Sequence, residues 1–164
     1  ESLDSQTELP DRVSLIKDIG VMKRYITAND MLSCLAVLQI DNYDKLIAVH
    51  GAVIWLEIFK YVASVSSRSM RPDDVVGRIS GGRIAILLVD MAKDSERLVL
   101  NRLRWQIASN PYVGVNKNII GLSVSISFCD IVGNIGDKET IEQCESALDN
   151  LSTGAHNVLV EVTV

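Results

Sequence analysis

Apolar positions along the chain fall into two kinds of segment. From Leu15 to Ile26 they recur at helical spacing, which predicts a helix over residues 10–27. Residues 34–40 form a nearly continuous apolar run, which is typical of a central strand covered on both faces. The same reasoning predicts further helices over residues 43–50, 52–67, 93–109 and 138–151, and further strands over residues 75–79, 84–89, 122–131 and 158–164.

The order of these segments indicates the fold class. One helix precedes the first strand, a helix pair broken near Gly51 follows it, and a strand pair then leads into alternating helices and strands. This order predicts an α/β (α+β) domain with a mixed central sheet of about five strands flanked by helices. The chain has 164 residues, which suits a single domain over residues 1–164 with one core.

A glycine-rich turn joins the two aliphatic strands over residues 75–79 and 84–89. Ser80, Gly81 and Gly82 lie between them. Tight two-residue hairpin turns favour residues of positive φ, which glycine adopts without steric cost. We therefore expect a β-hairpin in which these glycines take positive φ.

Charge and cysteine content exclude several classes of function. The net charge of -5, with no basic cluster, argues against DNA or RNA as a partner, although a small nucleotide remains compatible. Three cysteines without a Cys-x-x-Cys pair, and only two histidines, give no metal-ligand spacing. We expect a reducing, cytoplasmic location. The longest apolar segment, residues 51–65, is shorter than the roughly 20 residues of a membrane span, so we expect no direct membrane contact.

The hairpin resembles the signature of the GGDEF family, the diguanylate cyclases, whose motif reads Arg-Tyr-Gly-Gly-Asp/Glu-Glu-Phe. Ser80, Gly81, Gly82, Arg83 and Ile84 occupy the last five positions of that motif, and both acidic positions are lost. The similarity continues over nearly the whole chain. It includes the family's opening motif, matched at Asp4, Thr7, Leu9, Pro10 and Arg12, and the strand-helix motif over residues 39–52. The resemblance implies a GGDEF or nucleotidyl-cyclase-like palm fold.

The resemblance also implies that the metal-binding residues are missing. Cyclases of this family hold divalent metal with the first Asp of the first strand and the first acid of the hairpin, which fall here on Gln39 and Gly82. Asp41 remains, and Arg83 adds a positive charge that we expect to be exposed at the hairpin tip. Magnesium prefers hard carboxylate oxygens in octahedral geometry. We therefore predict no catalytic residue, no metal site and no cofactor.

This chain also differs from the family at the positions that bind the nucleotide. Its guanine-reading Asn and Asp fall on Ile47 and Leu56, and its triphosphate-binding Lys and Arg fall on Ser152 and His156. Trp55, beside Leu56, has two interpretations. It is either a core residue of an apolar helix, or it fills the former guanine pocket and offers a hydrophobic patch to a partner.

One ligand site of the family is retained in residue type. The inhibitory cyclic di-GMP site reads Arg-x-x-Asp and ends five residues before the signature, where Arg71 and Asp74 match it. Arg102 matches a further arginine that the family brings to this site. An arginine fork can pair with guanine or phosphate, and a carboxylate can accept hydrogen bonds from guanine. The alternative is that Asp74 caps a turn and Arg71 is a solvated surface charge.

These observations predict a degenerate, catalytically inactive GGDEF domain with a regulatory role in cyclic di-GMP signalling. Because the first residue is Glu1, we expect a fragment of a larger multidomain signalling protein, with the domain controlling an adjacent EAL phosphodiesterase or sensor module. Two alternatives stay open. The first is a cyclic di-GMP receptor acting through Arg71, Asp74 and Arg102. The second is a structural domain for homodimerisation or docking through the face that carries Trp55.

Overall fold

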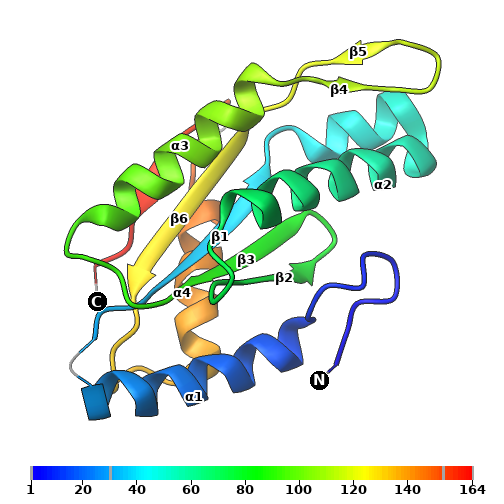
Figure 1. Cartoon of the computed structure of the whole chain (residues 1–164). Coiled ribbons are helices and arrows are strands. Elements are labelled where there is room, and N and C mark those ends of the chain that lie inside the picture. The colour runs from blue at the N-terminus through cyan, green and yellow to red at the C-terminus, as the bar shows by residue number, and fades with distance from the viewer. Residues whose placement is uncertain (1, 30, 153, 164) are drawn as a thin grey trace.

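The computed structural model describes residues 2–29, 31–152 and 154–163. A five-stranded mixed sheet in the order β2-β3-β1-β6-β7 forms the centre, and helices cover both of its faces (Figure 1). The strands of this sheet are β1 (Cys34–Ile40), β2 (Val75–Ser80), β3 (Arg83–Leu88), β6 (Val124–Asp130) and β7 (Leu159–Glu161). The helices are α1 (Arg12–Asn29), α2 (Tyr43–Ser69), α3 (Ser95–Ser109) and α4 (Asp137–Asp149). The predicted fold class is confirmed.

Strand β1 is the centre of the sheet. It pairs antiparallel with β3 on one side and with β6 on the other, so that Leu38 lies opposite both Ile84 and Ile126. Strand β7 pairs parallel with β6 at one edge. The continuous apolar run that predicted a strand covered on both faces is explained, because every residue of β1 except Gln39 is buried.

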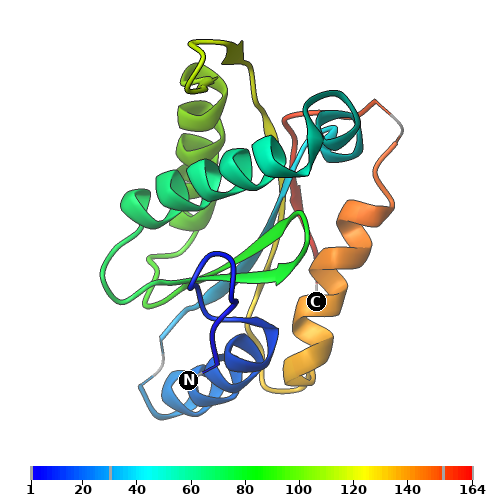
Figure 2. The same ribbon diagram turned by 90° about the vertical axis from the view of Figure 1, so that its right-hand side faces the viewer.

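Side chains alternate across the sheet and divide the core into two layers. Ala36, Leu38 and Ile40 of β1 pack with α2 and α3. Leu35 and Val37 point to the other face and pack with α1 and α4. Figure 2 shows α3 and α4 on opposite sides of β6. This two-residue alternation is the geometric property of a strand that places each residue on a known face.

Helix α2 contains the break predicted near Gly51. Gly51 has φ 85° and ψ 166°, which is not helical, and the helix continues beyond it. By length and composition alone α2 is apolar enough to cross a membrane. However, Trp55, Ile58, Phe59 and Val62 are buried in the core against the sheet. One face of α2 therefore packs into the core, while Val49 and Val53 on the helix are exposed.

Three details differ from the sequence-based predictions. Neither Gly81 nor Gly82 takes a positive φ, so the expected turn conformation is wrong; a register shift between Arg78 and Ser80 occurs beside the turn instead. A short hairpin, β4 (Tyr112–Val113) with β5 (Ile119–Ile120), was not predicted, because two-residue strands have too little periodicity to detect. The last strand is shorter than predicted, and residue 164 of that prediction lies outside the described residues.

Candidate functional site at the signature hairpin

Strand pairing brings a former metal-binding position of β1 beside an altered signature position of β3. In the register between β1 and β3, Gln39 lies directly opposite Arg83. The Nε of Arg83 donates a hydrogen bond to the Oε1 of Gln39 at 2.8 Å. The neutral amide that stands at the family's metal-binding position therefore accepts from an arginine of the neighbouring strand.

The guanidinium of Arg83 also binds α4. It donates to Asp149 and lies 3.8 Å from the Oε2 of Glu145. The other carboxylate oxygen of Glu145 accepts from Arg12 of α1 at 2.7 Å. The side chain of Arg83 is only 15% exposed, so the prediction of an exposed arginine at the hairpin tip is wrong. The reason is that residue 83 belongs to β3 and its side chain points to the sheet face that α4 covers.

Two aromatic rings cover the position of the first signature acid. A Cβ added at Gly82 would lie 3.3 Å from Cγ of Tyr43 and 3.6 Å from Cζ2 of Trp55. The ring centroids of Tyr43 and Trp55 are 6.0 Å apart, and those of Trp55 and Phe59 are 6.1 Å apart. Because Trp55 is 8% exposed, the structure supports its interpretation as a core residue and not as an exposed docking patch.

Asp41, the acid that remains, is held by hydrogen bonds. It is 7% exposed and accepts from the hydroxyls of Ser123 at 2.5 Å and Ser125 at 2.7 Å, and from the backbone N–H of Asn157 at 2.7 Å. These bonds connect the end of β1 to β6 and to the C-terminal segment. Both carboxylate oxygens thus have protein donors.

A cavity of about 320 Å³ lies next to Asp41 and is lined in part by Gln39, Ser152 and His156. The two positions that the resemblance assigns to triphosphate binding therefore face the same cavity as the former metal position. Nε2 of His156 lies 3.4 Å from Nδ2 of Asn42, the residue before α2. Ile47, at a guanine-reading position, packs against the core on α2.

The donor set around this cavity does not suit a divalent cation. Gln39 offers an amide oxygen that already accepts from Arg83, and Gly82 offers no side chain. Within residues 2–29, 31–152 and 154–163, no three His, Cys, Asp or Glu side chains come together at metal-binding spacing. Magnesium needs several oxygen ligands in near-octahedral geometry. The residues present therefore do not fit the metal that the resemblance implies.

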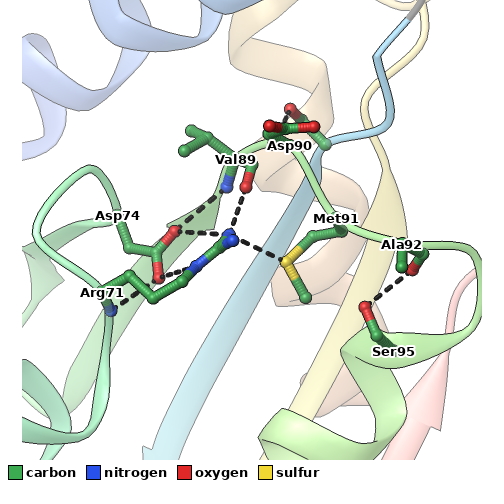
Figure 3. A network of polar contacts seen from close by, with 8 residues as sticks. Arg71, Asp74, Val89, Asp90, Met91, Ala92 and Ser95 are labelled. Carbon is green, nitrogen blue, oxygen red and sulfur yellow. Dashed lines mark hydrogen bonds and ion pairs between the residues drawn. The ribbon is translucent and has the colours of Figure 1, made fainter.

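Arg71 and Asp74 form a polar network at the turn before β2 (Figure 3). The carboxylate of Asp74 accepts from the backbone N–H of Arg71 at 2.9 Å and of Val89 at 3.1 Å, and from Nη2 of Arg71 at 3.3 Å. Nη2 of Arg71 also donates to the carbonyl of Val89 and to Sδ of Met91 at 3.1 Å. The side chain of Asp74 is 2% exposed, whereas that of Arg71 is 52% exposed.

The third residue of the predicted ligand site takes no part in this network. Arg102 is exposed on α3, and among the described residues no hydrogen bond or ion pair joins it to Arg71 or Asp74. The carboxylate of Asp74 has the turn-capping role that we considered as an alternative, while Arg71 presents a half-exposed guanidinium. A ligand-binding role for the three residues stays a prediction.

Sequence reasoning missed the acidic partners of Arg83. Glu145 and Asp149 are four residues apart on α4 and so lie on the same helix face. That spacing was readable in the sequence. However, nothing local indicated that this face would lie below the signature hairpin, because the contact joins residues more than 60 positions apart.

Curated relatives of this chain are diguanylate cyclases. It is 26% identical over 147 residues to diguanylate cyclase DgcP of Pseudomonas aeruginosa, an alignment that covers 88% of this chain and 22% of that protein. It is 23% identical over 137 residues to the probable diguanylate cyclase DgcT of Escherichia coli, covering 80% of this chain and 30% of that protein. The chain therefore spans less than a third of the length of these relatives.

Solved structures share the fold. The GGDEF domain of DgcB from Caulobacter crescentus, in complex with c-di-GMP, matches with a TM-score of 0.87 at 21% identity, covering 97% of this chain and 94% of that one. The FimX GGDEF domain from Pseudomonas aeruginosa matches with a TM-score of 0.86 at 15% identity, covering 99% of each chain. The family model described as "Diguanylate cyclase, GGDEF domain" matches residues 1–157. This chain belongs to the GGDEF domain family.

Proposed function

We propose that this domain acts in cyclic di-GMP signalling as a regulatory GGDEF domain that does not condense GTP. The observation that carries the proposal is the hydrogen bond from Arg83, at the second acidic position of the signature, to Gln39, at a position that the resemblance assigns to metal binding. Phosphodiester formation from two nucleoside triphosphates requires a cation that neutralises the developing charge on the phosphates. Here an arginine bound to α4 stands in place of a carboxylate.

The packing around the hairpin supports the same proposal. Tyr43 and Trp55 lie against Gly82, so a side chain at this position would require the Tyr43 ring to shift by a few tenths of an ångström. Asp41 is buried and bonded to Ser123 and Ser125. A metal at Asp41 would have to compete with these hydroxyl donors, and Asp41 and Asp44, the two carboxylates among the described residues that line this cavity, offer fewer oxygens than octahedral coordination needs.

Incubation of the purified domain with GTP and magnesium tests the proposal. We expect no cyclic di-GMP above the signal of a blank without protein, as measured by chromatography of the reaction mixture. An Asp41→Asn variant serves as the control for contaminating cyclase. Steady product formation by the wild type that is lost in Asp41→Asn would contradict the proposal.

We further propose that the domain works on a neighbouring module of a larger multidomain protein, either an EAL phosphodiesterase domain or a sensor domain. The basis is that the alignments of this chain cover only 22% of the length of DgcP and 30% of the length of DgcT. The test is the activity of the full-length protein with and without Arg83→Ala, because this variant loosens the hairpin from α4. An unchanged output activity would argue against control through this site.

A second candidate function is a cyclic di-GMP receptor. The observation that favours it is the half-exposed guanidinium of Arg71, which Asp74 holds in place. The contacts of Arg71 use Nε and Nη2, and within the described residues Nη1 makes no hydrogen bond. A guanidinium fixed on one edge can still pair with guanine or phosphate through the other.

Titration calorimetry with cyclic di-GMP tests the receptor proposal. We expect binding by the wild type, at least about tenfold weaker binding by Arg71→Ala, which corresponds to roughly 1.4 kcal/mol, and unchanged binding by the control Arg24→Ala, which removes an exposed arginine of α1. Arg102→Ala tests whether the arginine of α3 contributes. Binding that is equal in wild type and Arg71→Ala would exclude this site as the receptor.

A further inference from the structure

Two buried cysteines face each other between α4 and the sheet. The Sγ atoms of Cys129 on β6 and Cys144 on α4 are 3.6 Å apart, and the thiol of Cys144 donates toward Cys129. Cys129 is 1% exposed and Cys144 is fully buried. A disulfide bond of about 2.05 Å requires the two sulfurs to approach by about 1.5 Å, which side-chain rotation and a small helix shift can supply.

The surroundings hold the two cysteines in this arrangement. Ser127, on the same face of β6 as Cys129, donates its hydroxyl to the backbone carbonyl of Cys144 at 2.7 Å. This bond fixes the helix turn that carries Cys144 against the strand. The third cysteine, Cys34, is buried in the opposite layer of the core with α2 and α3. The sheet therefore separates Cys34 from the facing pair.

We propose that Cys129 and Cys144 form a reversible oxidation site that reacts with a hydroperoxide to give a disulfide between β6 and α4. The sulfur of Cys129 attacks one oxygen of hydrogen peroxide, the O–O bond breaks, and water leaves with formation of a sulfenic acid. The sulfur of Cys144 then attacks the sulfenic sulfur and releases a second water. Two thiols lose two electrons, the peroxide gains them, and the two thiol protons end in the two waters.

The chemistry assigns different roles to the two thiols. The hydrogen bond from Cys144 lowers the pKa of Cys129, which favours Cys129 as the attacking thiolate. The same hydrogen bond and burial raise the pKa of Cys144, which suits the resolving thiol. Because both sulfurs are buried, the reaction requires local opening of α4, and its rate reports that opening.

The site is next to the contacts of the signature hairpin. Glu145, the residue after Cys144, accepts from Arg12 and lies near the guanidinium of Arg83. A disulfide at Cys144 tethers this part of α4 to β6. Oxidation would therefore fix the helix that holds Arg83, and reduction by a small thiol would release it.

The test is peroxide treatment of the purified chain, followed by alkylation of the remaining thiols after unfolding and by peptide mapping. We expect wild type to lose two hydrogen atoms in mass, to carry one alkyl group on Cys34, and to give one peptide pair linked through Cys129 and Cys144. The disulfide would join two residues that are 15 positions apart, and closing a loop of this length stabilises the folded chain by restricting the unfolded one. We expect the melting temperature to rise on the order of 10 °C after oxidation and to return with dithiothreitol.

Variants distinguish this pair from chance oxidation. Cys34→Ala should keep the cross-link, whereas Cys129→Ala and Cys144→Ala should each abolish it. Because a variant in the core can lose stability, the wild-type peptide map stands as an independent measurement. Alkylation of all three cysteines after peroxide treatment, or a cross-link that includes Cys34, would overturn the proposal.

Discussion

Replacing Arg83 by alanine tests whether this arginine holds the altered signature hairpin to the rest of the domain. The substitution removes the hydrogen bond to Gln39, the bond to Asp149 and the weaker contact with Glu145. Glu145 keeps Arg12 as a partner at 2.7 Å. The largest loss of stability is therefore expected at Gln39, because its amide oxygen is left without a donor in a partly buried position.

The expected cost follows from the burial of each contact. A hydrogen bond from a charged donor in a partly buried site contributes about 1.5–3 kcal/mol. Asp149 is 63% exposed, so its pair with Arg83 is screened by solvent and contributes about 0–1 kcal/mol. We expect Arg83→Ala to lower the free energy of unfolding by about 1.5–4 kcal/mol. In a domain of this size each kcal/mol lowers the melting temperature by about 2–4 °C.

Urea unfolding followed by circular dichroism measures this cost. Arg24→Ala, an exposed arginine of α1, is the matched control and should change stability by no more than about 0.5 kcal/mol. Arg83→Lys keeps the charge without the planar fork and should give an intermediate loss. A double-mutant cycle with Gln39→Ala should show a coupling energy of at least about 1 kcal/mol.

The reasoning would be refuted by an Arg83→Ala variant as stable as Arg24→Ala. A coupling energy near zero between residues 39 and 83 would refute the assignment of the stabilisation to their hydrogen bond, even if Arg83→Ala were destabilised. In that case the loss of stability would come from the contacts of Arg83 with Asp149 and Glu145 on α4 or from burial of its apolar stem.

Three further predictions test other parts of the site. Asp41→Ala should lower the free energy of unfolding by about 3 kcal/mol in urea titration, because it leaves the buried hydroxyl of Ser125, the partly buried hydroxyl of Ser123 and a backbone N–H without an acceptor. Burial, the largest single influence, raises the pKa of Asp4, but hydrogen bonds from Thr7 and Arg78 outweigh it and leave this pKa below its ordinary value of 3.8. The ionised carboxylate of Asp4 therefore stabilises the fold above pH 3.8, and this stabilisation is lost as the pH falls through the lower pKa of the folded state. Melting curves of wild type and Asp4→Asn should differ at pH 7 and converge in acid. Gly51→Ala should cost about 1–3 kcal/mol in thermal unfolding, because φ 85° with ψ 166° is a backbone conformation that essentially only glycine adopts; an unchanged melting temperature would show that α2 closes its break without loss.

Local pattern was sufficient for most of the fold. The bounds predicted for β1 agree with the structure, because a strand buried on both faces has an unbroken apolar run. The break at Gly51 was also predictable, since glycine lacks the Cβ that disfavours its conformation. The β4–β5 hairpin was not predictable, because its two-residue strands depend on anchoring contacts such as that of Tyr112 with Glu57 on α2.

The amino-acid sequence by itself determined which layers form and which acids the signature has lost, because side-chain period and residue identity are local properties. Only the tertiary structure decided which contacts the residues at those positions make. The contact of Arg83 with α4, the aromatic packing on Gly82 and the facing of Cys129 and Cys144 all join segments that are separate along the chain. Such contacts arise when strand register and helix packing fix distances between remote residues, and no local pattern encodes those distances.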